Sequence, residues 1–266
     1  MIIDKYNKRV EKINSLVCVG LDSDFEKIPE RFKQLKFPQF EFNKWIIDQT
    51  AEYTAAFKPN TAFYEARGDA GMRELKMTME YLQKNYADIF TICDAKRADI
   101  GNTNNGYTAA IFDWLGFDAI TLHPYLGSEA LKPFLDREDK ISIILCRTSN
   151  PGAGELQDLV VQATGLPLWQ IVAKKVAGEW NKNYNCMLVV GATYPEEMKK
   201  IREIVGDMTL LVPGVGAQGG DVKAVVEAGI NSQKLGIIIN SSRGIIFAQD
   251  PAGEAKKLRD EINLYR

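Results

Sequence analysis

Eight short apolar runs constrain the fold of this chain more than any other feature of its sequence. Each run is nearly continuous in Val, Ile, Leu and Phe instead of alternating with polar residues, which is typical of strands covered on both faces of a parallel sheet. The runs lie at 15–21, 55–60, 89–96, 118–124, 140–149, 185–193, 208–216 and 235–243.

Helical patterns lie between several of these runs. Asp69 is a candidate N-cap for a helix whose apolar residues recur every three or four positions, and later helices are predicted to begin at Pro195, Asp221 and Asp250. Eight strands alternating with helices match a (β/α)8 TIM barrel, whereas a doubly wound sheet usually has fewer strands. Because no linker-like segment interrupts the pattern, we predict a single barrel domain over residues 1–266.

Composition argues against several kinds of partner and location. Lys and Arg total 33 against 35 Asp and Glu, so the net charge of -2 leaves no basic surplus for binding nucleic acid. No apolar run approaches the ~18 residues that a membrane span requires, and the first 15 residues lack the apolar core of a signal peptide, so we expect no membrane association and a cytoplasmic protein. The four cysteines fall in apolar runs without metal-binding spacing, and we expect buried free thiols.

The most informative motif is DAKRADIGNT, at residues 94–103. In a barrel of this class the chemistry lies where the strands end, and Asp94 and Lys96, two apart on a strand, would project to the same side, with Asp99 just beyond. Lys58 ends a neighbouring strand, which completes a set of two positive and two negative charges. Such a set is either a structural ion pair that closes the barrel or an array that holds one lysine protonated and aimed.

A candidate phosphate site follows the last two runs. Barrels commonly bind phosphate there, and VPGVGAQGGD (212–221) supplies glycines that allow close backbone approach, with Gln218 as a side-chain donor. Arg243 offers a guanidinium fork, without which the glycine-rich segment would be only a turn. Two connections, 22–42 and 149–167, exceed the usual few residues and are typical of lids or binding loops.

These motifs together resemble the orotidine 5'-phosphate decarboxylase family. DAKRADIGNT matches the family's DxKxxDIxxT signature, and Lys58 matches its lysine at the end of the second strand. VGLDSD, FKPN, RTSNPGA, VPGVGAQGGD and NSSRGI resemble further family motifs in the same order along nearly the whole chain. The long connections resemble the bacterial subfamily with longer loops.

The resemblance implies decarboxylation of orotidine 5'-monophosphate to uridine 5'-monophosphate in pyrimidine synthesis, without a cofactor or metal. Lys96 would donate a proton to C6, Asp94 would lie beside the departing carboxylate, and Lys58 and Asp99 would complete the array. A homodimer is also implied, in which Asp99 and Thr103 reach the partner's site, although Thr103 could equally cap a helix.

Further ligand contacts follow from the same resemblance. Asp22 would bind a ribose hydroxyl, Ser149 would read the amide edge of the pyrimidine, and Gln218 and Arg243 would bind the phosphate. Asp22 could instead be a turn or capping residue, and Ser149 an ordinary loop serine.

Three other functions stay open on the residues alone. A metal-dependent sugar-phosphate lyase or synthase of the same suprafamily shares the DxKxxD pattern. Those enzymes resemble one another in having a glutamate at the position of Lys58, so the lysine here argues against that function. A non-catalytic phosphoester-binding barrel would leave the costly charged array unexplained. A Schiff-base aldolase is disfavoured because the neighbouring carboxylates favour the ammonium form of Lys96 over the neutral amine.

Overall fold

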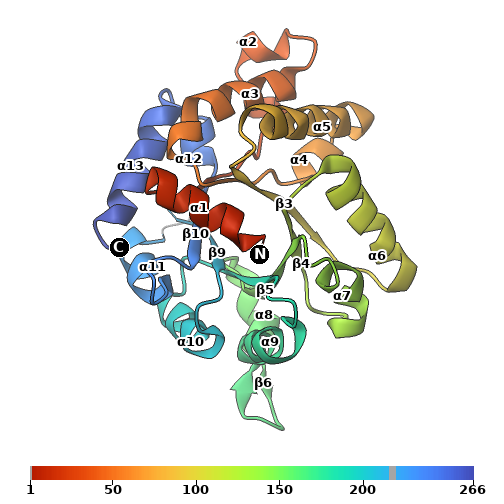
Figure 1. The fold of residues 1–266 in the computed structure, drawn as a ribbon, viewed down its shortest axis with the longest axis vertical. Coiled ribbons are helices and arrows are strands. Elements are labelled where there is room, and N and C mark those ends of the chain that lie inside the picture. The colour runs from red at the N-terminus through yellow and green to blue at the C-terminus, as the bar shows by residue number, and fades with distance from the viewer. Residues whose placement is uncertain (1, 216–219) are drawn as a thin grey trace.

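The computed structural model, which describes residues 2–215 and 220–266, contains a closed barrel of eight parallel strands (Figure 1). Around the barrel the strand order is β1-β10-β9-β8-β5-β4-β3-β2. The strands are β1 (Val17–Val19), β2 (Ala56–Phe57), β3 (Phe90–Arg97), β4 (Ala119–Leu122), β5 (Ile141–Arg147), β8 (Cys186–Val190), β9 (Leu210–Pro213) and β10 (Ile237–Ser241). Each of the eight apolar runs coincides with one of them, with β3 extending one residue past its run, so the predicted (β/α)8 barrel is confirmed.

Helices surround the strands in the alternating order expected of this fold (Figure 1). They are α1 (Ile3–Ile13), α2 (Glu30–Lys33), α3 (Pro38–Thr50), α4 (Ala62–Glu65), α5 (Gly68–Asn85), α6 (Gly101–Thr108), α7 (Gly127–Leu135), α8 (Gly154–Gln157), α9 (Leu168–Lys175), α10 (Pro195–Val205), α11 (Val222–Gly229), α12 (Arg243–Ile246) and α13 (Pro251–Asn263). Short π-helical segments, Ala109–Leu115 and Val176–Trp180, continue α6 and α9. None of the helices in the described part of the chain combines the length and hydropathy that crossing a membrane would require.

Most of the predicted helix starts are correct. The Asp221 carboxylate accepts a hydrogen bond from the Ala224 N–H, and the Asp250 carboxylate caps α13 in the same way. The N-cap predicted at Asp69 is wrong, because α5 begins one residue earlier, at Gly68, and Asp69 lies in its first turn. An acidic residue is favourable in either position, which is why sequence does not distinguish them.

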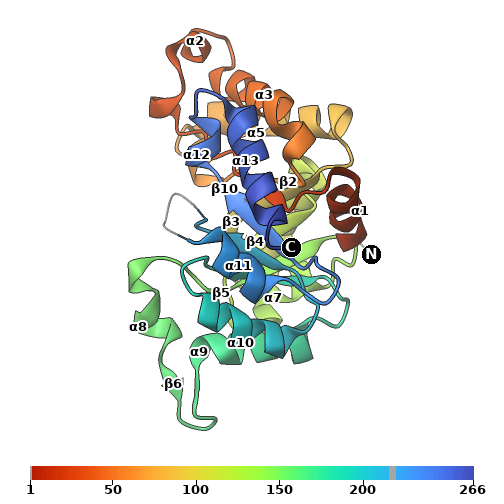
Figure 2. The same ribbon diagram turned by 90° about the vertical axis from the view of Figure 1, so that its left-hand side faces the viewer.

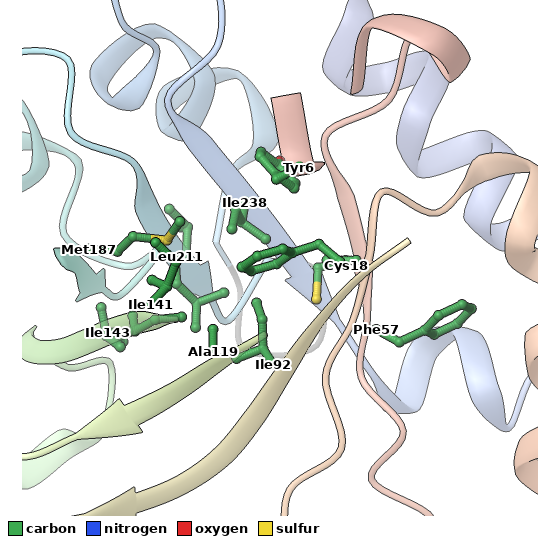
Figure 3. Close-up of a cluster of buried hydrophobic side chains, with 14 of the residues drawn as sticks. Tyr6, Cys18, Phe57, Ile92, Ala119, Ile141, Ile143, Met187, Leu211 and Ile238 are labelled. Carbon is green, nitrogen blue, oxygen red and sulfur yellow. The ribbon is translucent and has the colours of Figure 1, made fainter. Parts of the chain in front are cut away.

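Apolar side chains fill the barrel, and α1 covers its amino-terminal end. In Figure 3 the side chains of Cys18, Ile92, Leu211 and Ile238 lie between the strands, and each is buried. Tyr6 of α1 is also buried, and its hydroxyl donates a 2.7 Å hydrogen bond to the carbonyl of Ile237 at the start of β10. Among the described residues all four cysteines are free and buried, as predicted, and burial raises the pKa of the Cys18 thiol to about 12.

The two long connections have structure of their own. The first contains α2, and the second contains α8 and a two-stranded antiparallel hairpin of β6 (Val160–Val161) and β7 (Leu166–Pro167). Figure 2 shows the second connection extending away from the barrel. Both follow barrel strands, so they flank the carboxyl end of the barrel, where the polar motifs lie.

Candidate active site

The carboxyl ends of the barrel strands surround a cavity of about 500 Å³. Six of the predicted site residues line it: Asp22, Lys58, Asp94, Lys96, Ser149 and Arg243. Asp99 and Thr103 are not among its lining residues, and Gln218 lies outside the described part of the chain. Side chains from five different strand ends therefore meet in one place, as expected for a barrel enzyme.

Asp94 is the centre of the charged part of the cavity. Its Oδ2 accepts a 2.8 Å hydrogen bond from Lys58 Nζ, and its Oδ1 accepts one of 2.6 Å from Lys96 Nζ. Lys58 is buried, whereas the side chain of Lys96 is half-exposed to the cavity. One carboxylate thus binds two ammonium groups, one buried in the cavity wall and one more exposed to the cavity.

The backbone at Lys96 departs from regular strand geometry. Its φ is +45°, in the left-handed region that residues with a side chain seldom adopt, and the pairing of β3 with β4 shifts register between Cys93 and Arg97. Simple alternation along a strand therefore does not account for the convergence of Asp94 and Lys96. Strained backbone of this kind persists only where surrounding contacts hold it, and it is enriched at functional sites.

Thr121 supplies part of that support, and sequence reasoning missed it. Its hydroxyl accepts a 3.0 Å hydrogen bond from the Lys96 N–H and donates one of 2.9 Å to Asp94 Oδ1. Thr121 lies in β4 and is buried. A threonine within an apolar strand is an ordinary β-former, so its sequence context carries no signal of this role.

Electrostatics keep the buried pair ionised. Burial alone would raise the pKa of Asp94, but the ammonium charges of Lys58 and Lys96 outweigh it and hold that pKa well below its usual value. Burial likewise opposes the charge of Lys58, yet the carboxylates of Asp94 and Asp22 raise the Lys58 pKa above its usual value. Asp94 and Lys58 are therefore both charged at neutral pH.

Asp22, on the segment after β1, lines the same cavity. Its Oδ1 is buried and has no hydrogen-bond partner among the described residues. An unpartnered buried oxygen is costly unless a ligand satisfies it, so this atom marks a place for a donor in the cavity.

The residues on both sides of Asp22 are held by Tyr64, a second residue that sequence reasoning missed. The Tyr64 hydroxyl donates to the carbonyl of Leu21 at 2.8 Å and accepts from Ser23 at 3.2 Å. Asn43 also donates to it, at 2.9 Å. Tyr64 is buried, so these contacts fix the segment that carries Asp22.

Ser149 lines the cavity and packs closely against Gly191. A Cβ at Gly191 would lie 2.8 Å from both the backbone nitrogen and the Cβ of Ser149, so a larger residue there would displace the serine. The preceding residue, Thr148, is held by Gln157 of α8: its N–H donates to Gln157 Oε1 at 3.0 Å, and its hydroxyl accepts from Gln157 Nε2 at 2.8 Å. The second long connection is thereby tied to the cavity wall.

Arg243 provides a positive charge on the side of the cavity formed by the loops after β9 and β10. Its side chain is exposed and forms no hydrogen bond or ion pair with other described residues. Gly214 and Val215 line the cavity beside it. An unpaired guanidinium beside glycine backbone suits a bidentate anion such as a phosphate.

Asp99 and Thr103 lie outside this cavity. Asp99 is partly exposed, and its carboxylate accepts a hydrogen bond from the N–H of Ile100 at 2.7 Å. Thr103 is exposed within α6, which begins at Gly101, so the alternative that Thr103 caps this helix is wrong. Among the described residues no group of three or more His, Cys, Asp or Glu is placed to hold a metal ion.

Comparison with known proteins assigns this arrangement to a family. The sequence matches the "Orotidine 5'-phosphate decarboxylase / HUMPS family" over residues 15–258. The chain belongs to this family.

Its relatives include orotidine 5'-phosphate decarboxylases from Cellvibrio japonicus, 46% identical with 99% of this chain and 98% of the relative aligned, and from Halorubrum lacusprofundi, 48% identical with 97% of each covered. A solved structure of the Leishmania donovani OMP decarboxylase is similar, with a TM-score of 0.88 and 39% identity over 99% of this chain and 98% of that one.

Proposed function

We propose that this protein converts orotidine 5'-monophosphate to uridine 5'-monophosphate and CO2, a step of pyrimidine synthesis. The observation that carries the proposal is that Lys58 and Lys96 both bind Asp94 at the wall of a cavity of about 500 Å³. Relatives named orotidine 5'-phosphate decarboxylase, which align with this chain over 97–98% of their own length, support it.

The chemical step requires a positive charge beside C6 of the pyrimidine. When the bond from C6 to the carboxylate breaks, its electron pair stays on C6, and the adjacent ring positions do not delocalise it. The ammonium of Lys96 stabilises this carbanion and then transfers a proton to C6, after which the neutral amine regains a proton from water. Asp94 orients that ammonium and repels the substrate carboxylate, a repulsion that is relieved as CO2 leaves.

The remaining cavity residues bind the parts of the substrate that do not react. Asp22 Oδ1 accepts a hydrogen bond from a ribose hydroxyl, which satisfies its unpartnered oxygen. Ser149 reads the amide edge of the pyrimidine, and Arg243 binds the phosphate together with Gln218. Binding energy from these distant groups holds the reacting carbon against Lys96.

The complete site is composite. In the proposed homodimer Asp99 and Thr103 of each chain reach the site of the other, where Asp99 helps to orient Lys96. Their position outside their own cavity supports this arrangement. So do two exposed apolar side chains, Ile100 next to Asp99 and Tyr125 after the neighbouring strand β4, which are 59% and 83% exposed respectively.

Activity after metal removal tests the proposed reaction. Because side chains fill every role, protein treated exhaustively with EDTA should consume orotidine 5'-monophosphate at the untreated rate, followed by ultraviolet absorbance. Loss of activity that magnesium restores would instead support the metal-dependent lyase.

Subunit complementation tests the composite site. Lys96→Ala and Asp99→Ala homodimers should each be nearly inactive, but one site of a mixed dimer collects both changes and the other collects neither. With random exchange, half of the dimers carry one intact site of two, so activity should rise to about a quarter of wild type. If mass spectrometry confirms exchange and no activity returns, Asp99 acts within its own chain.

A further inference from the structure

Asn104 binds the backbone of Asp99 through both ends of one side chain. Its Oδ1 accepts a 2.8 Å hydrogen bond from the Asp99 N–H, and its Nδ2 donates to the Asp99 carbonyl at 2.5 Å. Nδ2 also donates to the carbonyl of Ala130 in α7, again at 2.5 Å. Asn104 is fully buried, so water does not compete for these bonds.

These contacts require an amide. The Asp99 N–H needs an acceptor, whereas the two carbonyls need donors, and only asparagine offers both at this length. The orientation of the amide group follows from the same requirement, since rotation by 180° would place donor against donor. A leucine at this position would remove the hydrogen-bond partners of the Asp99 N–H and carbonyl and the contact to the Ala130 carbonyl.

The effect of Asn104 is to fix where the Asp99 carboxylate points. Asp99 follows β3 on a loop, and within the described chain its side chain forms a hydrogen bond only with the adjacent N–H of Ile100. Ala130, in contrast, is fully buried in α7. Asn104 therefore connects the loop to a packed helix, and the orientation of the Asp99 side chain depends on this connection.

We propose that Asn104 is a positioning residue that acts in trans: it holds Asp99 of its own chain in the orientation that the partner's site requires. The inference rests on the proposed composite site. It predicts that a change at Asn104 damages the site to which its chain lends Asp99 and leaves the site of its own Lys96 intact.

Matched alanine variants test the local effect. Asn104→Ala should lower kcat by about 10- to 100-fold, because a displacement of about 1 Å in an active site costs on this order. Asn105→Ala removes an exposed amide from the next position of α6 and should keep wild-type kcat. Asn104→Leu, which keeps the branched shape without the polar atoms, should behave like Asn104→Ala, and size-exclusion chromatography should show dimers in each case.

Complementation then distinguishes positioning in trans from a general structural defect. Mixing Asn104→Ala with Lys96→Ala should raise activity to about a quarter of wild type, because one site of each mixed dimer is intact. Mixing Asn104→Ala with Asp99→Ala should leave activity at the mean of the two parent homodimers. Both changes affect the Asp99 that a chain contributes to its partner's site, so each site of the mixed dimer keeps one defect. Asn104 would then share the complementation behaviour of Asp99.

Three results would overturn this inference. The first is a kcat of Asn104→Ala equal to that of Asn105→Ala, and the second is loss of the dimer in both Asn104 variants. The third is no gain of activity when Asn104→Ala is mixed with Lys96→Ala. The last result is informative when the Lys96→Ala and Asp99→Ala mixture does gain activity, since the composite site then stands and only the role of Asn104 is wrong. If that reference mixture also fails, the composite site itself is wrong.

Discussion

Two buried carboxylates, Asp94 and Glu74, have similar burial and different consequences. Glu74 Oε2 accepts from the N–H groups of Gln39 and Phe40 at 2.6 and 2.9 Å, and Oε1 accepts from Arg67 Nη1 at 2.7 Å. It thereby satisfies the amino-terminal end of α3. Asp94 is bound instead by two lysines and Thr121 at the edge of a cavity.

The difference shows that a buried ion pair is not by itself a sign of chemistry. Glu74 lines no described cavity, and its oxygens are used by backbone groups and by one arginine that also donates to Gln39. At Asp94 one of the bound cations, Lys96, is half-exposed to open volume. A cation that is held by a carboxylate yet faces a cavity is positioned to act on a ligand.

The largest expected effect is the loss of Lys96. Lys96→Ala should lower kcat by about 10⁴-fold or more, because one group supplies both charge stabilisation and the proton. Binding of uridine monophosphate, measured by calorimetry, should persist. Lys256→Ala, an exposed lysine of α13, is the control and should keep wild-type kcat. A Lys96→Ala enzyme with near-normal turnover would place Asp94 in the same structural class as Glu74.

Arg243 sharpens the comparison because its guanidinium, unlike that of Arg67, has no partner among the described residues. Arg243→Ala should raise KM by about 10- to 100-fold through loss of charged hydrogen bonds to the phosphate. Steady-state kinetics would measure this, with inorganic phosphate as a competing ligand. An unchanged KM would show that the phosphate binds elsewhere.

Glu74→Gln should have the opposite profile to Lys96→Ala. Removing the charge leaves Arg67 partly buried without its ion partner and weakens the cap of α3, so the free energy of unfolding should fall by about 2–4 kcal/mol. Turnover at temperatures where the variant is folded should stay near that of wild type. Urea unfolding and kcat measured on the same sample would test both halves. A large loss of kcat without loss of stability would contradict the distinction.

The smallest expected effect is a difference in acid sensitivity. The pKa of Asp94 is lower in the folded protein than in the unfolded chain, so its contribution to stability is present above the unfolded value of about 3.9 and is lost as the pH falls. Below about pH 4 the free energy of unfolding should therefore fall more steeply for wild type than for Asp94→Asn, by at most about 1.4 kcal/mol per pH unit. Urea unfolding at several pH values would measure the slopes, and parallel slopes would refute a lowered pKa.

The sequence by itself determined the barrel and most of the residues at its mouth. Strands buried on both faces must be apolar throughout, so each strand was visible as a run without reference to its neighbours. The charges in DAKRADIGNT and at Lys58 then stood at strand ends, where a barrel places polar groups together. Motif order supplied Asp22, Ser149 and Arg243, which the structure brings into the same cavity.

Only the tertiary structure decided which groups hold those residues in place. Thr121, Tyr64 and Asn104 act through hydrogen bonds to other segments, and an isolated threonine, tyrosine or asparagine carries no periodic signal of such contacts. The left-handed backbone at Lys96, where the pairing of β3 with β4 shifts register, is equally invisible in the sequence. Periodicity records whether a side chain is buried, whereas the direction of a buried hydrogen bond depends on chain segments that meet only after folding.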